Sequence, residues 1–351
     1  MRPAPLRAYR PGMEIRPVDV YDDALIRTWH RASEIIERSD RPPCTFFSEQ
    51  ELVTQLREGD PEERAEPFTA YVGDDVVGTG MLYVPLLDNL DKIYFTVGVL
   101  PEHRSKGYGD ALLEHAVALT RAEQRPVMVG WTHLPVEGYH DDPRHRFAVR
   151  HGFSLANLEM RRLLELPIPD ERLQAWADEA AAHHEGYRIE PFVDRVPDHL
   201  KPSLVELHNQ LAVDAPTGDL DFEAGRATVE IFDEQMRQMR LTGREMFMTL
   251  AIHTEEDGTE RTVAHTTMSC PPGDHDLPFL NQWGTFVDRS HRGHRLGLAV
   301  KAANLRQIQK AHPERTLIST TNSADNGPMV AINEQMGFRP VELSAEYLKR
   351  L

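Results

Sequence analysis

The stretch that decides the fold is residues 283–300, WGTFVDRSHRGHRLGLAV. Its apolar start predicts a buried strand, its basic and glycine-bearing middle predicts a turn, and the residues from Leu296 onwards predict a helix. A turn that opens a helix directs several unpaired backbone N–H groups at one point, where the helix dipole and nearby arginines add positive charge. The stretch therefore predicts an anion-binding site, with phosphate as the expected guest.

The same order of parts occurs earlier in the chain, at residues 94–111, YFTVGVLPEHRSKGYGDA. Aligning Val99 with Val287 also aligns the arginines and the last glycines of the two turns. The paired landmarks are Ile15 and Ile189, Arg104 and Arg292, and Gly152 and Gly337, at offsets of 174, 188 and 185 residues. Landmarks in one order at nearly one offset indicate a duplicated domain.

Size and composition narrow the class of protein. A chain of 351 residues predicts two domains. No apolar run approaches the ~18 residues that a membrane span needs, and a formal charge of −17 argues against nucleic acid. Cys44 and Cys270 are too few and too far apart for a disulfide framework, so we expect a cytoplasmic protein. Residues 1–12 are basic and broken by prolines, which predicts a disordered arm.

We expect an α/β (α+β) fold of two tandem domains, 13–166 and 188–351, joined by a helical linker at 167–187. Each domain should contain a mixed, mostly antiparallel sheet flanked by helices. We call the strand that leads into the glycine-bearing turn the motif strand, and we expect the longest helix of each domain to follow it. The first half predicts strands at 13–18, 69–72, 76–83, 126–131 and 160–166, and helices at 24–38 and 48–58. Ser48 and Glu51 form a capping-box pattern for the second of these helices.

At the turn, the residues Arg104-Ser105-Lys106-Gly107-Tyr108-Gly109 resemble the GNAT superfamily of acyl-coenzyme A-dependent N-acyltransferases. The family signature is Arg/Gln-x-x-Gly-x-Gly/Ala at a strand-to-helix turn that binds the coenzyme A pyrophosphate. A second landmark, an Asn followed by a closing Gly-Phe, resembles the segment from Asn326 to Phe338. The resemblance spans residues 13–351 and implies acetyl-CoA as the cofactor. It implies these cofactor-binding residues: Val99, Arg104, Ser105, Lys106, Gly107, Gly109, Phe286, Val287, Arg292, Gly293, His294, Arg295, Gly297, Leu298 and Asn326.

The chain departs from the family pattern at three places. Arg295 replaces the first glycine in the second half, where its guanidinium could reach the same phosphates. Asp110 opens the helix in the first half and would repel a pyrophosphate if it faced inward. The family's tyrosine acid is replaced by Asn333 in one half and by Ala148 in the other, so the thiolate needs another proton donor.

Candidates for the missing chemistry lie in the second half. His265, in an expected strand, is either the general base or a satisfied core residue. Asn322 either donates to the thioester region or caps the next helix, and Asn333 completes the catalytic candidates. The acidic loop at residues 214–223 either binds the amine of the substrate or is simply solvated. The substrate-binding candidates in it are Asp214, Asp219, Asp221 and Glu223. His291 and His294 show no metal-ligand spacing, and we expect no metal.

The resemblance implies an acetyl-CoA-dependent N-acetyltransferase acting on a primary amine of a small molecule, and the polar candidates place the chemistry in the C-terminal domain. We expect neither a nucleic-acid nor a membrane partner, and a monomer or a homodimer. The alternative is a non-catalytic module that binds CoA or a metabolite, because the tyrosine is missing and the second turn is altered. A dinucleotide-binding fold fits less well, since the order Gly-x-Gly-x-x-Gly is absent.

Overall fold

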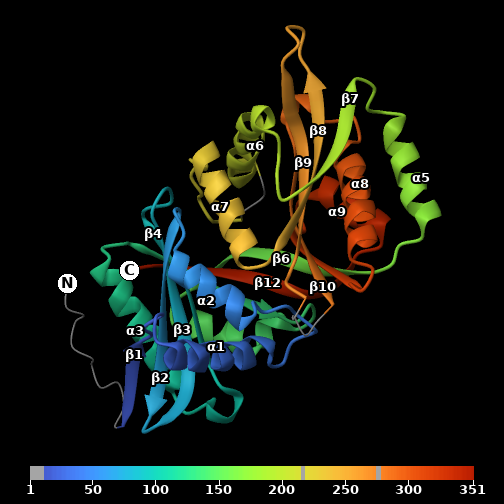
Figure 1. Cartoon of the computed structure of the whole chain (residues 1–351). Coiled ribbons are helices and arrows are strands. Elements are labelled where there is room, and N and C mark those ends of the chain that lie inside the picture. Colours follow the sequence, from blue (N-terminus) through green and yellow to red (C-terminus); the bar gives the residue numbers. More distant parts are fainter. Residues whose placement is uncertain (1–11, 215–217, 274–277) are drawn as a thin grey trace. The chain divides into compact units, whose positions relative to one another are not determined.

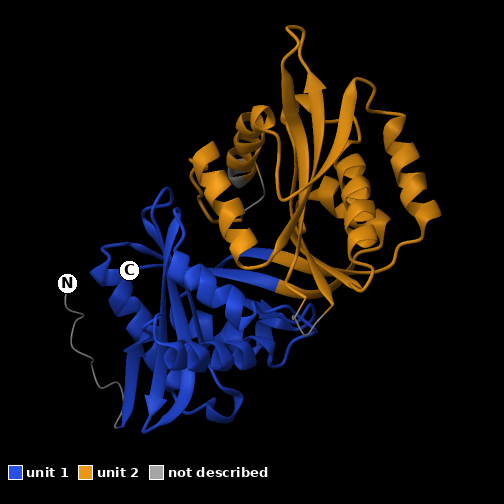
Figure 2. Ribbon diagram, viewed as in Figure 1, with its two compact units in different colours: residues 1–158, 344–351 blue, residues 159–343 orange. Residues whose placement is uncertain are grey.

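The computed structural model describes residues 12–214, 218–273 and 278–351. The expected arm at residues 1–11, and residues 215–217 of the acidic loop, lie outside this range. The chain forms two compact units, which Figure 2 shows in different colours. Unit 1 comprises residues 1–158 and 344–351, and unit 2 comprises residues 159–343.

The units are divided differently from the expected domains, 13–166 and 188–351. The helix at Asp170–Ala181 belongs to unit 2, because Leu173 and Trp176 share a core cluster with Leu298. Its apolar face is therefore covered by the second half, and it is not a free linker. At the other end, the last strand of the chain returns residues 344–351 to unit 1.

Unit 1 has a sheet with helices packed on it. In chain order the elements are β1 (Met13–Pro17), α1 (Asp23–Arg38), α2 (Glu49–Glu58), β2 (Glu63–Val72), β3 (Asp75–Pro85), β4 (Lys92–Val99), η1 (Pro101–His103), α3 (Tyr108–Ala122), β5 (Val127–Leu134), η2 (Tyr139–Asp141) and α4 (Pro143–Arg150). The strand order begins β1-β2-β3-β4-β5. These strands pair antiparallel except β4 with β5, which is parallel.

Unit 2 repeats this plan with the helix α5 added. Its elements are α5 (Asp170–Ala181), β7 (Tyr187–Val193), η3 (Asp198–Leu200), α6 (Lys201–Asp214), α7 (Val229–Leu241), β8 (Glu245–Thr254), β9 (Glu260–Cys270), β10 (Phe279–Val287), η4 (Arg289–His291), α8 (Leu296–Ala311), β11 (Leu317–Ser323) and α9 (Gly327–Met336). The strands β6 (Ser154–Glu165) and β12 (Arg339–Arg350) each contribute residues to both units. Within unit 2 the order is β6-β11-β10-β9-β8-β7, and β10 with β11 is the parallel pair.

Helices cover both faces of the unit 2 sheet (Figure 1), and an apolar core lies on each face. On β8, Met246, Met248 and Leu250 pack in the cluster that also contains residues of α6 and α7. Phe247, between them, packs in the cluster of α5 and α8. This alternation follows from the two-residue period of a strand. It explains why β8 reads as a continuous apolar run, since neither face meets water.

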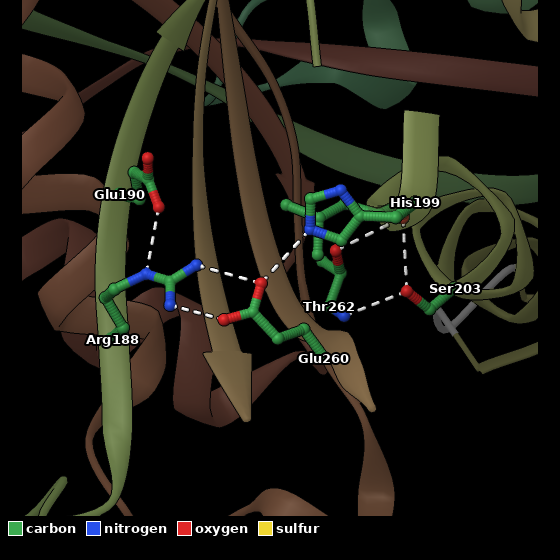
Figure 3. Close-up of polar contacts among 7 residues, drawn as sticks. Arg188, Glu190, His199, Ser203, Glu260 and Thr262 are labelled. Carbon is green, nitrogen blue, oxygen red and sulfur yellow. Dashed lines mark hydrogen bonds and ion pairs between the residues drawn. The ribbon is translucent and has the colours of Figure 1, made fainter. Parts of the chain in front are cut away.

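Polar contacts hold the start of α6 against β9 (Figure 3). The Ser203 hydroxyl accepts a hydrogen bond from the backbone N–H of Thr262 at 2.8 Å and donates to the Leu200 carbonyl at 3.1 Å. Nearby, the Glu260 carboxylate accepts two hydrogen bonds from the Arg188 guanidinium, at 2.6 and 3.2 Å. Anchoring α6 at its N-terminus fixes where its C-terminal turn lies, and that turn enters the candidate site.

Most sequence-based expectations are confirmed. The sheets are mixed and mostly antiparallel, and both capping-box hydrogen bonds of Ser48 and Glu51 are present. The expectation about the longest helix is confirmed in unit 2, where the 16-residue α8 is the longest one described. It is wrong in unit 1, where α1 has 16 residues and α3 has 15. The apolar periodicity of α1 correctly predicted that this helix extends to Arg38. The end of α3 could not be predicted, because no glycine or other stop signal marks it in the sequence, so its length relative to α1 was unknown.

Candidate functional site

In each unit the two parallel strands separate beyond a short ladder. β4 pairs with β5 from Lys92 to Phe95, although both strands continue beyond that point. β10 pairs with β11 from Phe279 to Asn281 only. Beyond the ladder, the edges of the separated strands have backbone N–H and C=O groups available to bond an extended molecule as an added strand. We call the opening between β10 and β11 the unit 2 splay.

The two motif strands, β4 and β10, differ in regularity. Within the described pairings β10 has a bulge, and the pairing of β4 with β3 has none. Gln282 pairs with Met268 and Thr285 pairs with Thr266, so β10 contains one more residue than β9 over this interval. In unit 1 the pairing of β4 with β3 is regular from Tyr94 to Val99. A bulge turns neighbouring backbone and side-chain groups away from the regular ladder, and bulges are frequent beside active sites.

Each motif turn contains two positive-φ residues, two positions apart. In unit 1 they are Ser105, with φ 60°, and Gly107, with φ 79°; in unit 2 they are Gly293, with φ 89°, and Arg295, with φ 55°. Glycine therefore occupies the second of these positions in one unit and the first in the other. Alternation of left-handed and ordinary residues directs backbone N–H groups into a concavity that suits an anion. Arg295 adopts this conformation despite its Cβ.

The helices that follow both turns begin without a capping side chain. Gly107 and Arg295 are the N-caps of α3 and α8, and neither forms a side-chain cap hydrogen bond. The unpaired N–H groups of the first helical turn are thus available to a ligand. Gly109 and Gly297 also allow close packing of neighbouring helices. A Cβ on Gly297 would lie 3.1 Å from Cδ1 of Ile332, and a Cβ on Gly109 would lie against Phe147.

The two signature arginines make equivalent contacts. Nε of Arg104 donates to the Val99 carbonyl at 3.3 Å, and Nε of Arg292 donates to the Val287 carbonyl at 3.2 Å. Each guanidinium also binds an aspartate at the end of a helix, Asp40 after α1 in unit 1 and Asp214 in α6 in unit 2. These contacts orient both arginines at the end of the motif strand.

Asp214 binds two arginines of the turn. Arg289 donates to its carboxylate at 2.7 and 3.0 Å, and Arg292 donates at 3.1 Å. These ion pairs direct the Asp214 carboxylate toward the turn, whereas the sequence predicts that it binds the substrate amine. The other acidic candidates, Asp219, Asp221 and Glu223, are exposed residues of the segment between α6 and α7.

The remaining cofactor candidates differ in where their side chains lie. Arg295 binds Glu179 of α5 at 2.5 Å, which directs its guanidinium away from the role expected for it. His294 contacts the ring of Tyr187 and the His183 carbonyl. Leu298 is buried in the core, and Phe286 lies under the Arg292 guanidinium, 5.7 Å from its ring centre. The Lys106 ammonium donates to the Glu102 carbonyl at 2.8 Å.

The Asp110 carboxylate lies against two basic side chains. It binds Arg150 at 2.7 Å and His151 at 2.8 Å. The repulsion considered from the sequence is therefore balanced by two partners on and after α4.

His265 is buried beside the bulge. Its side chain lies 3.7 Å from the position that a Cβ on Gly284 would take, and neither ring nitrogen has a hydrogen-bond partner among the described residues. The ring of His208, on α6, meets it edge-on at 4.5 Å. Burial, together with His208, holds the pKa of His265 well below its ordinary value, so the imidazole is neutral at physiological pH. Unpartnered buried nitrogens are costly, which favours a hydrogen-bonding ligand as the missing partner.

The asparagine candidates are hydrogen-bonded to one another. Nδ2 of Asn333, on α9, donates to Oδ1 of Asn322, at the end of β11, at 3.1 Å. Asn326 accepts the backbone N–H of Met329 as the N-cap of α9. Sequence analysis missed three neighbours of these candidates: His208, Arg162 and Lys301. Alignment of the two halves could have found Lys301, because it lies four residues after Gly297 where the first half has the apolar Leu113 four residues after Gly109.

One group of potential metal ligands occurs elsewhere in unit 2. Atoms of Glu245, Cys270 and His312 lie within 4.8 Å of one another. Nε2 of His312 lies 2.7 Å from a carboxylate oxygen of Glu245, and burial raises the pKa of the Cys270 thiol to about 11.

The unit 2 turn suits the diphosphate of a CoA molecule. It combines uncapped amides at the start of α8, two arginines, and the open side of Gly293, where a Cβ would meet nothing within 4 Å. None of the helices that the structure describes has the length and apolarity needed to cross a membrane.

Comparison with known proteins agrees with this geometry. Residues 27–153 match the Acetyltransferase (GNAT) family. The mycothiol acetyltransferase of Saccharomonospora viridis is 27% identical over 253 residues, which are 71% of this chain and 72% of that protein.

Solved structures extend the likeness to nearly the whole chain. A tandem GNAT protein from the clavulanic acid biosynthesis pathway matches with a TM-score of 0.77 and 25% identity, over 96% of this chain and 98% of that chain. A GCN5-related N-acetyltransferase from Sphaerobacter thermophilus shares the fold, with a TM-score of 0.63 and 14% identity over 97% and 96% of the two chains. Unit 1 therefore carries the match to the GNAT family, and the chain as a whole has the tandem architecture of a GNAT-type N-acetyltransferase.

Proposed function

We propose that this protein transfers the acetyl group of acetyl-CoA to a primary amine of a small molecule, and that unit 2 performs the chemistry. The observation that carries the proposal is the bulge of β10 beside the splay, with the unpartnered His265 imidazole next to it. Acetyl-CoA supplies an activated acetyl thioester when it is bound. The chain's own residues must bind its diphosphate, place its acyl end and move protons.

Diphosphate binding falls to the turn. Arg289 and Arg292 already orient their guanidinium groups on Asp214, and a diphosphate would compete with that carboxylate for them. The amides from Gly293 to Gly297 add uncharged donors and the positive end of the helix dipole. The backbone around Phe286 and Val287, at the end of the splay, is the proposed donor to the acyl oxygen.

Proton transfer from the acceptor amine falls to His265. An amine is protonated at neutral pH and must lose its proton before it can attack. A ring nitrogen of His265 accepts that proton, because the imidazole is neutral and has no protein partner in the described residues. His208, the edge-on neighbour, is also neutral, since burial lowers its pKa to about 4. Asp219, Asp221 and Glu223 attract the ammonium group to this side of the sheet.

Unit 1 has a less complete set of groups, which supports the division of labour. Its motif strand is regular, and a Cβ on Gly98 would lie 2.3 Å from Cγ2 of Ile36, so that side chain occupies the space beside the end of β4. Ala148 replaces the polar Asn333. Unit 1 keeps the intact glycine pair, and CoA binding without chemistry is the proposed alternative for it.

The test compares the equivalent arginines. Thiol release from acetyl-CoA is measured across a panel of small primary amines for the wild type, Arg292→Ala and Arg104→Ala. We expect Arg292→Ala to reduce kcat/KM by about 1.5–3 kcal/mol, roughly tenfold to 150-fold, because a charge-assisted hydrogen bond to phosphate is lost. Arg104→Ala should change it little, although it removes the equivalent carbonyl and aspartate contacts. Equal losses, or a loss only in Arg104→Ala, would contradict the assignment to unit 2.

A further inference from the structure

A buried lysine lies behind the asparagine pair of unit 2. Lys301, on α8, is 1% exposed, and its ammonium donates to Oδ1 of Asn333 at 2.8 Å. The ring of Phe338 is 5.2 Å from Nζ. Burial is the single cause of a fall in the pKa of Lys301 from 10.5 to about 7. A lysine is seldom buried so completely without a carboxylate, so its presence calls for a reason.

The hydrogen bonds around Lys301 have a fixed direction. An ammonium group only donates, so Asn333 must present its oxygen to Lys301 and its Nδ2 to Asn322. Arg162, on β6, donates to the same Asn322 oxygen at 2.9 Å. Asn322 lies on β11 beyond Ser319, the last residue paired with β10, and therefore on the separated part of that strand. The chain of donors thus runs from the helix core to the splay.

The first half of the chain provides a natural comparison. Leu113 is four residues after Gly109, as Lys301 is four residues after Gly297. The partner position, four residues before the closing glycine, is Ala148 in unit 1 and Asn333 in unit 2. Leu113 is buried, as Lys301 is. Both positions are therefore polar in unit 2, as Lys301 and Asn333, and both are apolar in unit 1, as Leu113 and Ala148. The polar pair lies in the unit whose motif strand has the bulge.

We propose that Lys301 is a positioning residue of the unit 2 site: it holds the Asn333 carboxamide with its N–H groups toward the splay and couples this orientation to its own protonation. The inference rests on the proposed function. When Nζ loses a proton to solvent, it becomes a neutral amine that can also accept a hydrogen bond. The Asn333 carboxamide can then turn either its oxygen or its nitrogen toward Lys301, so its orientation is no longer fixed. One hydrogen of Asn333 Nδ2 binds Asn322; the other is the donor offered to the acyl or thiolate end of the bound thioester.

The charged groups near this network include Arg162 on β6, whose pKa is lowered by burial against the opposing charge of Glu334 on α9. Glu179 on α5 binds Arg295, and Arg172 on α5 donates to the Gln335 carbonyl of α9. Arg161 on β6 and Glu342 on β12 form a buried ion pair. Toward β8, the neighbouring polar contact is neutral, between Thr249 and Asn304 at 3.0 Å. On β9, His265 contacts His208 of α6, which packs with the opposite face of the sheet. An ionisation near neutral pH that disappears with Lys301 is therefore assigned to Lys301 itself.

The first experiment observes the lysine without turnover. The chain has six lysines, so their side-chain signals can be resolved by NMR in the full-length protein. In the wild type we expect one ε-methylene signal to titrate near pH 7 and to be absent in Lys301→Met, with a side-chain amide signal of Asn333 shifting over the same range. Titration of Lys301 at about its ordinary pKa, near 10.4, would overturn the inference.

The second experiment separates positioning from binding. Lys301→Met should reduce kcat about tenfold or more, leave KM for acetyl-CoA within about twofold, and remove the neutral ionisation from the pH profile of kcat. Lys301→Arg, a donor that does not titrate, should restore part of kcat without restoring that ionisation. Leu113→Met, at the equivalent position of unit 1, should match the wild type. An unchanged kcat and pH profile in Lys301→Met overturns the inference and leaves the proposed function standing. A wild type inactive with every amine refutes the proposed function, and the NMR titration then decides the inference alone.

Discussion

Replacing Lys301 by methionine should stabilise the protein, and the gain should depend on pH. The pKa falls from 10.5 to about 7, which is about 3.5 powers of ten in proton affinity. At about 1.4 kcal/mol for each, burying the charged form costs at most about 5 kcal/mol. Methionine avoids this cost but leaves Oδ1 of Asn333 without its donor, a loss of about 1–3 kcal/mol. We therefore expect the free energy of unfolding to rise by about 2–4 kcal/mol below pH ~7.

The sign of the pH dependence follows from proton binding. Between pH ~7 and ~10 the unfolded chain keeps a proton on Lys301 that the folded protein has lost, so the wild type gains stability as the pH rises. The advantage of the methionine variant should shrink over that range. Urea unfolding followed by circular dichroism, at about pH 6 and about pH 9, measures both quantities. Leu113→Met is the control without pH dependence. A methionine variant less stable than the wild type at about pH 6, or an advantage equal at both pH values, would refute the reasoning.

Two further changes probe the other side of the splay. His265→Leu should abolish most turnover while leaving the melting temperature equal or higher, because it removes two buried nitrogens that have no partner in the described residues; retained turnover would exclude His265 as the proton acceptor. Asp214→Asn should tighten the binding of inorganic pyrophosphate severalfold by calorimetry, since the carboxylate no longer competes for Arg289 and Arg292; weaker binding would show that Asp214 is needed to orient them.

Local sequence signals were sufficient for many elements of the fold, although α4, α7 and β8 were not predicted. The capping box at Ser48, the apolar periodicity of α1 and the strand-turn-helix order around Arg104 and Arg292 involve residues close together in the chain. The repetition of that order predicted two tandem units without any long-range contact. Such features are determined by backbone conformation and by which residues must avoid water, and both can be read from a short window.

The site required contacts between distant segments. The sequence alone suggested that Arg295 could bind phosphate and that Asp214 could bind an amine. In the structure Arg295 binds Glu179 on α5, and Asp214 binds the turn arginines. A charged side chain takes the nearest opposite charge that the fold provides, and the distance between two such residues is not encoded in either segment.

By itself, the sequence determined the duplicated strand-turn-helix, the mixed sheet and the signature arginines. Only the tertiary structure decided that β10 carries a bulge, that His265 lies unpartnered beside it, and that Lys301 is buried on the opposite face of the sheet. A lysine in a helix normally indicates a solvated face, and a histidine in a strand has no preferred environment. Their protonation is controlled by burial, and burial is a property of the packed sheet and helices together, not of the residues next to them in the chain.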